Sequence, residues 1–397
     1  MASAPPILIT PNFLLPSSTA TCDYRCVVNA LGTAVIFERS VLKSDGDFGS
    51  PQLYLLDLTQ SGTTPSSFIG DQNIEISDRP DWCWRTGQVA FNFGPDIWVG
   101  VVDSSGGNFR SLGAQTASMN YPTWFPNGKT LAVENYAASS QPNPGPSYPL
   151  PNTTTIDSST GVPVTPDLEG LDLWAGMPSV NPVNPNLIVF AGQPVSGSTY
   201  NQDMNYIYVM DTSSSEGPSL LESEALGPGP FNPNYQGRAP WWSPDGKWVV
   251  FESNRPSQYE ANGLYAIYLY EYLGSGPAIQ VTSTIYNCNH AKWFPNGFSG
   301  GPAGAFQLIV ASWIGSQSDP PTGPYGLSSL GPHATRDYVL ILGSKIAHLQ
   351  SDRGDCSGPA VSEHPHHDQD DDGCDNVMLR LPVMHGEEGL IAFGGSL

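Results

Sequence analysis

The chain has 397 residues and is rich in Gly (42) and Pro (38), with 11% aromatic and only 13% charged side chains. This composition argues against intrinsic disorder and indicates a β-rich protein with many turns. The 37 acidic residues outnumber the 15 basic ones, for a formal net charge of -22, and this scarcity of basic residues argues against nucleic acid and anionic membranes as partners.

The first stretch, MASAPPILITPNFLLPSS, lacks the basic start of a signal peptide and carries prolines where its apolar core would lie. The chain is therefore either intracellular or numbered from a mature N-terminus. Few lysines, abundant Gly, Pro, Ser and Asn, and a glycosylation sequon at Asn152 favour an extracellular or periplasmic protein. No apolar run approaches the roughly 20 residues that a membrane-spanning helix needs.

A repeated pattern starts at Tyr24 and runs through the chain. Its clearest copy is RAPWWSPDGKWVVFESNR at 238–255, where a Trp precedes a Pro-Asp-Gly turn and an alternating strand. YPTWFPNGKTLAVENY at 121–136 and RPDWCWRTGQVAFNF at 79–93 are similar copies. The residues in the Trp position are mostly 42 to 62 residues apart, namely Val28, Trp82, Trp124, Val180, Trp242, Trp293 and Met384. A period of this length is typical of propeller blades.

Further strands are expected after this pattern. Alternating apolar residues followed by Asp, Ser or Gly indicate a strand that enters a hairpin, as at 51–62, 96–107, 205–217 and 265–276. Residues 278–283 then supply an outer strand. We therefore predict an all-β fold, a single β-propeller domain over 1–397 with four-stranded antiparallel blades. Seven blades are favoured over six, and residues 5–10 are expected to pair with strands in 377–397 and close the ring.

The copy at 238–283 contains P-x-W-S-P-D-G-K, then VVF, IY-x-Y-x-x-x-G and QVTS. These residues resemble the TolB-like propeller repeat, which also occurs in the propeller domains of prolyl-oligopeptidase-type peptidases. The resemblance is strong in this copy, clear around Trp82, Trp124 and Trp293, and weak elsewhere. It implies the architecture of most of the chain and little about function, because the repeat residues shape blades.

Residues 137–170 form a Pro- and Ser-rich insertion. Their composition argues against a strand pair, so we expect this insertion to cover one face or to contact a neighbour.

A second insertion, 351–376, contains HPHHDQDDDGCDN. Its motif D-x-D-x-D-G matches the first half of a calcium loop, in which alternate carboxylates converge on one ion. The loop resembles those of thrombospondin type 3 repeats, and the expected ligands are Asp368, Asp370, Asp372, the Cys374 carbonyl and Asp375. Zn²⁺ bound with His364, His366 and His367 is the alternative metal, and a solvated acidic loop is the alternative to a metal site.

The six cysteines are an even number and allow many pairings. Cys356 and Cys374 bracket the second insertion and would close it if oxidised. Cys22 and Cys26 are a candidate local pair.

Several usual catalytic motifs are missing from the chain, namely H-E-x-x-H, phosphate-binding Gly loops and C-x-x-C. Candidate ligand-binding residues are those expected where inner strands meet the axial channel, namely Arg25, Arg79, Tyr121, Arg238 and His290. The Trp residues of the repeat are expected to pack between blades. Off-pattern aromatics are better candidates for ligand contact, namely Trp84, Trp98, Trp174, Trp241 and Trp313.

These observations favour a non-enzymatic binding or assembly module for a protein or carbohydrate ligand, with calcium stabilising the second insertion. The main alternative is a metal-dependent lyase, lactonase or hydrolase with its site at the axial channel. Self-association into a filament or surface layer is a third hypothesis.

Overall fold

A computed structural model describes the strands of the chain and many of their connections. The described residues are 12–13, 21–41, 43–44, 49–59, 64–67, 76–102, 107–117, 119–135, 152–164, 173–194, 205–222, 236–255, 265–274, 277–283, 288–295, 305–313, 337–345, 378–380 and 394–396.

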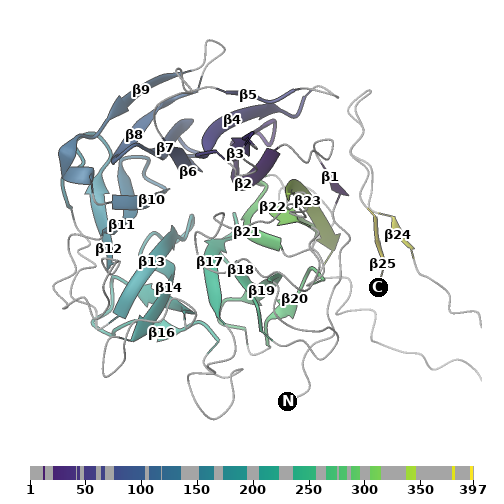
Figure 1. The fold of residues 1–397 in the computed structure, drawn as a ribbon. Coiled ribbons are helices and arrows are strands. Elements are labelled where there is room, and N and C mark those ends of the chain that lie inside the picture. The colour runs from purple at the N-terminus through teal and green to yellow at the C-terminus, as the bar shows by residue number, and fades with distance from the viewer. Residues whose placement is uncertain are drawn as a thin grey trace, which may run out of the picture.

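The strands form five four-stranded antiparallel sheets and one three-stranded sheet, arranged around a central axis (Figure 1). The first two sheets contain β2 (Thr21–Val28), β3 (Ala34–Val41), β4 (Gln52–Asp57) and β5 (Ser66–Ser67), then β6 (Ser77–Trp82), β7 (Gln88–Phe93), β8 (Asp96–Val101) and β9 (Asn108–Ser111). The three-stranded sheet contains β10 (Met119–Trp124), β11 (Thr130–Asn135) and β12 (Asn152–Asp157). The next two contain β13 (Leu173–Val180), β14 (Leu187–Pro194), β15 (Tyr206–Asp211) and β16 (Ser219–Leu220), then β17 (Gly237–Trp242), β18 (Trp248–Ser253), β19 (Ala266–Glu271) and β20 (Ile279–Gln280). The last contains β21 (Cys288–Trp293), β22 (Ala305–Trp313), β23 (Asp337–Lys345) and β1 (Asn12–Phe13).

The innermost strands β2, β6, β10, β13, β17 and β21 follow one another around the axis, and β21 contacts β2 again. Each one begins its sheet and is followed by its antiparallel neighbour in sequence. The predicted propeller of four-stranded antiparallel sheets is therefore confirmed.

The predicted number of blades is wrong, because the described residues hold five four-stranded sheets rather than seven or six. In the three-stranded sheet, only an isolated bridge between Ile156 and Pro163 follows β12 in place of a fourth strand. The C-terminal residues expected to build a seventh unit contribute β24 (Met378–Arg380) and β25 (Gly394–Ser396), which pair only with each other. The predicted partner of these strands, 5–10, lies outside the described residues, and the described β1 pairs with β23 instead.

The turn between the first and second strand explains the Gly of the repeat. Gly128 and Gly246 have positive φ, 68° and 70°, and donate their N–H groups to Phe125 and Ser243 three residues earlier. This conformation favours glycine because it lacks a Cβ atom. The preceding side chain, Asn127 or Asp245, accepts backbone N–H groups just after the Gly and fixes the turn.

The residues in the Trp position of the repeat end the inner strands and lie at the contacts between sheets. Trp124, Trp242 and Trp293 are buried, and Val28 and Val180 take the same place in their strands. Trp82 is half-buried and packs against a neighbouring core. The predicted packing role of these residues is confirmed, except that Met384 lies outside the described residues.

The Pro- and Ser-rich insertion is not free of sheet structure, since β12 lies within 137–170 and pairs with β11 over six residue pairs. Its threonines are buried, as the third strand of a sheet requires. β-branched Thr favours strand structure despite the surrounding prolines, and the prediction overlooked this run.

The proposed disulfide between Cys22 and Cys26 is also wrong. Both residues belong to the extended strand β2, and Cys26 is a free, buried thiol. Residues four apart in a strand are separated by about 13 Å, well beyond the reach of a disulfide. Cys83 is likewise a free, buried thiol and Cys288 is buried in β21, whereas Cys356 and Cys374 lie outside the described residues.

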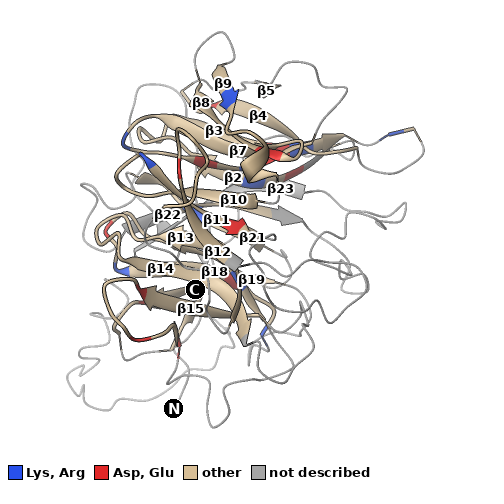
Figure 2. Ribbon diagram, turned by 90° about the vertical axis from the view of Figure 1, so that its left-hand side faces the viewer, with Lys and Arg blue, Asp and Glu red and all other residues tan. Residues whose placement is uncertain are grey.

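Lys and Arg positions are spread over several parts of the described chain (Figure 2). The only described helical element is the short η1 (Ala114–Thr116), and no described helix is long and apolar enough to cross a membrane.

Candidate functional site

Every inner strand is interrupted at the same position by a shift in its pairing with the next strand. Each shift contains one residue with φ between 31° and 53°, namely Arg25, Arg79, Tyr121, Met177, Ala239 and His290. In four of the strands a proline follows, which suits a bulge because Pro cannot donate to the ladder. A bulge redirects the local side chains, and here it presents one residue from each strand to the central channel.

Buried glutamates hold half of these bulges from the neighbouring sheet. Glu38, Glu134 and Glu252 occupy the second strands β3, β11 and β18. Their carboxylates accept the backbone N–H groups of Arg79 at 2.6 Å, Met177 at 2.6 Å and His290 at 2.5 Å. Charge-assisted bonds of this kind are stronger than neutral ones. They fix the left-handed backbone and join adjacent sheets at the channel wall.

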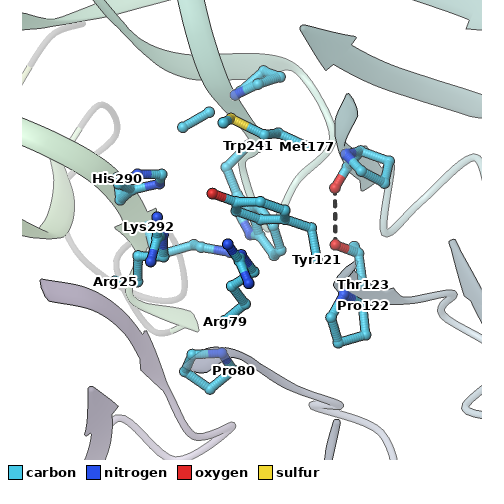
Figure 3. Close-up of a pocket in the computed structure, with 13 residues that line it drawn as sticks. Arg25, Arg79, Pro80, Tyr121, Pro122, Thr123, Met177, Trp241, His290 and Lys292 are labelled. Carbon is cyan, nitrogen blue, oxygen red and sulfur yellow. Dashed lines mark hydrogen bonds between the residues drawn. The ribbon is translucent and has the colours of Figure 1, made fainter. Parts of the chain in front are cut away.

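The bulge residues line a pocket at one end of the channel, which we call the axial pocket (Figure 3). Arg25, Arg79, Tyr121 and His290 form one side, and Met177 and Ala239 with neighbouring prolines form the other. The pocket has a volume of about 40 Å³. A polar, basic half therefore faces an apolar half.

The two arginines of the axial pocket are anchored from behind by acids that do not line it. Arg25 forms an ion pair with Glu38 at 2.8 Å, and Arg79 forms one with Asp78 at 2.8 Å. Both guanidinium groups also lie over the ring of Tyr121, at 5.4 and 4.6 Å from its centroid. The buried Nε of Arg25 has no hydrogen-bond partner among the described residues.

Burial and charge set the protonation of these groups. Burial lowers the pKa of Arg25, but the Glu38 carboxylate together with Tyr121 and Tyr24 outweighs it, so the guanidinium pKa is raised and the group stays charged. Burial, with further contributions from Arg25 and Arg238, lowers the pKa of His290 well below its usual range. His290 is therefore neutral at pH 7, and the positive charge of the axial pocket comes from the arginines.

Arg238 lies one residue before the bulge position, which Ala239 occupies. Its guanidinium pairs with Glu252, donates to Asn289 at 3.2 Å and lies 4.0 Å from the centre of the Tyr265 ring. It does not line the axial pocket. The structure thus brings four of the five predicted ligand-binding residues together and places Arg238 behind them.

Two positions beyond each bulge lies a second ring of residues, namely Val27, Asp81, Thr123, Ser179, Trp241 and Lys292. Several of them tie neighbouring sheets together. Asp81 accepts the Trp124 N–H at 2.8 Å, and the Thr123 hydroxyl donates to the Pro178 carbonyl at 2.8 Å (Figure 3).

Beyond this ring the channel widens into a cavity of about 360 Å³, which we call the tryptophan cavity. Its walls include Asp81, Arg85 and Lys292 and six tryptophans, namely Trp82, Trp84, Trp124, Trp241, Trp242 and Trp293. Sequence reasoning missed Asp81 and Lys292 as site residues. Their constant spacing from Arg79 and His290 is the signal that points to them.

The remaining predicted contacts fall elsewhere. Of the off-pattern aromatics, Trp84 and Trp241 line the tryptophan cavity, Trp174 is buried, and Trp98 packs in the core. The predicted calcium ligands Asp368, Asp370, Asp372, Cys374 and Asp375 lie outside the described residues, as does the side chain of Trp313. Within the described residues no group of three His, Cys, Asp or Glu side chains is placed to hold a metal ion.

No protein-family model and no curated protein sequence matches the chain. Among solved structures it is similar to TolB from Acinetobacter baumannii, with 15% identity and a TM-score of 0.42, over 82% of this chain and 64% of that one. It is also similar to an oligogalacturonate lyase in complex with manganese (12% identity, TM-score 0.45, 86% and 98% of the two chains). A third is a luciferin-regenerating enzyme (11% identity, TM-score 0.48, 84% and 95%). These neighbours agree with a β-propeller and, at such distances, carry no argument about function.

Proposed function

We propose that the chain is a non-enzymatic binding module that receives a carboxylate group of its ligand in the axial pocket. The observation that carries this proposal is the pair of arginines in the pocket wall, with no acidic residue lining it. Guanidinium groups bind carboxylates through charge-assisted, often bidentate hydrogen bonds. The Nε–H of Arg25 offers a donor for which the described residues supply no acceptor.

The size of the axial pocket supports a carboxylate rather than a whole ligand. Its volume of about 40 Å³ holds about three water-sized groups, which matches one carbon and two oxygens. The apolar side formed by Met177 and Ala239 suits the carbon chain next to the carboxylate. The rest of the ligand, a protein or a carbohydrate, would lie outside the pocket.

The net charge of -22 does not oppose such binding. Salt screens charges beyond about 10 Å at 0.1 M ionic strength, so the guanidinium groups next to the carboxylate dominate. The excess of acidic residues would repel anions that do not pair with the arginines of the axial pocket, which favours selectivity among anionic ligands.

Thermal unfolding at constant ionic strength tests this proposal. Sodium acetate should raise the melting temperature relative to sodium chloride, whereas acetamide should not. A ligand at ten times its Kd stabilises the folded state by about 1.4 kcal/mol. Equal melting temperatures in acetate and chloride would remove the carboxylate site.

The source of the carboxylate can be tested in the same assay. A protein ligand predicts that a peptide with a free C-terminus protects more than its amidated form. A carbohydrate ligand predicts that glucuronate protects more than glucose.

We also propose that Ca²⁺ stabilises the insertion 351–376 of an extracellular or periplasmic protein. The support is the spacing of Asp368, Asp370 and Asp372 before Gly373, which suits the oxygen ligands of Ca²⁺. EDTA should lower the melting temperature and added Ca²⁺ should restore it, because an ion that binds only the folded state stabilises it. Restoration by Zn²⁺ alone would favour the histidine-containing alternative, and no response to either ion would contradict both.

A further inference from the structure

The tryptophan cavity is large enough for a ligand of its own. Its volume of about 360 Å³ lies within the range of about 300–1,000 Å³ for small-molecule sites. Its aromatic walls suit a flat, apolar ring, because such rings pack against indole faces with a gain beyond simple burial. The axial pocket adjoins it, since Thr123, Trp241 and Lys292 line both, and is far smaller.

Lys292 is the basic residue that the two spaces share, since its side chain lines both. It is half-buried, so part of its side chain remains accessible within the channel. Its Nζ lies 2.7 Å from the centre of the Trp241 ring. Within the described residues it forms no salt bridge, which leaves the amine facing an indole rather than a carboxylate.

The surroundings of this amine favour its neutral form. Burial lowers the pKa of Lys292 to about 7, although Asp81 and Cys26 act in the opposite direction. The other titratable groups that line the axial pocket with it include the neutral His290 and the charged Arg25. The neutral amine is therefore far more abundant for Lys292 at pH 7 than for an ordinary lysine, of which about one in 2,500 is unprotonated.

We propose that Lys292 reacts reversibly with an aromatic aldehyde or ketone in the tryptophan cavity and forms an imine. The amine lone pair attacks the carbonyl carbon, and the C–N bond forms as the carbonyl oxygen takes up a proton. Loss of that oxygen as water from the carbinolamine then gives the imine, so one carbonyl compound and one amine yield one imine and one water, without oxidation. Neutral amines are the nucleophiles in such reactions, and desolvated lysines supply them.

Asp81 is the carboxyl group of the cavity wall that can carry the proton in this sequence. It is buried on β6, and burial raises its pKa while Lys292 lowers it. We assign it as a positioning and proton-carrying residue.

The test traps the imine in the full chain. The protein is incubated with benzaldehyde at pH 7, reduced with cyanoborohydride, digested, and mapped by mass spectrometry. Benzylation of Lys292 should be at least about tenfold faster than that of Lys43, Lys129 or Lys247, and the excess should shrink at pH 10, where all these amines are neutral to a larger extent. Labelling of Lys292 no faster than that of the other lysines would overturn the proposal.

Variants distinguish imine formation at Lys292 from labelling that reflects only the solvent exposure of a lysine. Lys292→Arg should abolish the rapid labelling, whereas Lys247→Arg, a change in an exposed turn, should leave it unchanged. Asp81→Asn should slow the dehydration step and thereby change the pH profile of labelling, which a purely structural role would not do. The wild-type map decides the question even if these variants fold poorly, and it is independent of acetate binding in the axial pocket.

Discussion

The ionisation of Lys292 should make a large contribution to the pH dependence of the free energy of unfolding. Its pKa is near 10.5 in an unfolded chain and about 7 in the fold. Between these values the unfolded state binds more protons, so this residue makes the free energy of unfolding rise with pH.

Lys292→Met should remove that dependence. The variant should gain most over the wild type below pH 7, and the gain should shrink as the pH approaches 10.5. Melting temperatures of both proteins between pH 6 and 10 measure it. Burial raises the pKa of Cys26 from 9.0 to about 12, which lowers the free energy of unfolding above about pH 9, but this effect is common to both proteins and cancels in their difference. A difference that stays constant with pH would contradict a lowered pKa.

Glu134 tests the buried carboxylates that join neighbouring sheets. Its side chain is buried and accepts the Met177 N–H at 2.6 Å. Glu134→Ala leaves that N–H without this acceptor and should lower the free energy of unfolding by about 1–3 kcal/mol. Glu134→Gln keeps an acceptor oxygen and should lose less. Chemical denaturation measures both, and equal losses would mean that the hydrogen bond contributes little.

At the scale of the element, the bulge in each inner strand is the feature that builds the site. Ala239 adopts a φ of 49° although it carries a Cβ atom. Such a backbone conformation is unfavourable for L-residues by about 1–2 kcal/mol. The repeated bulge keeps this strain because it turns side chains into the channel.

Ala239→Gly should therefore raise the free energy of unfolding by about 0.5–1 kcal/mol, the relief of strain less the entropy of the unfolded glycine. Ala266→Gly is the matched control, since Ala266 is buried in β19 without a positive φ and glycine there should destabilise. Denaturant unfolding of both variants checks the contrast. The same sign of change at both positions would show that strain at the bulge is small.

The strands that belong to the repeated sequence pattern could be predicted. The Trp residue, the Gly turn and the alternating strand carry local signals, so the ends of β6, β10, β17 and β21 follow from the sequence. β12 was missed because the prolines and serines around it suggested a loop, whereas pairing with β11 decides its structure. The bulges have no local signature apart from the proline that follows four of them, since they depend on the facing strand.

At the scale of the whole molecule, the ring of inner strands makes a site from residues far apart in the sequence. Arg25 and His290 come from the first and last of these strands and meet in one pocket. Their meeting was predictable from the repeat, because equivalent positions of stacked units share one end of the channel. The absence of Arg238 from this pocket was not predictable, because it depends on a shift of a single residue along β17.

The number of sheets could not be read in the same way. Met384 fits the repeat pattern, but a blade also needs partner strands, and the nearby β24 and β25 pair only with each other. The sequence pattern of one strand does not predict how many other strands will pair with it.

Acetate titration of two matched variants tests whether Arg25 in the axial pocket binds carboxylates. Glu38→Gln removes the competing carboxylate and keeps one acceptor oxygen for the Arg79 N–H while releasing Arg25, so acetate should bind about tenfold more tightly, or about 1.4 kcal/mol. The double variant Arg25→Gln, Glu38→Gln removes the charged pair without leaving an unpaired buried charge. It should fold and lose the protection by acetate. Equal protection of the wild type and both variants would contradict the account.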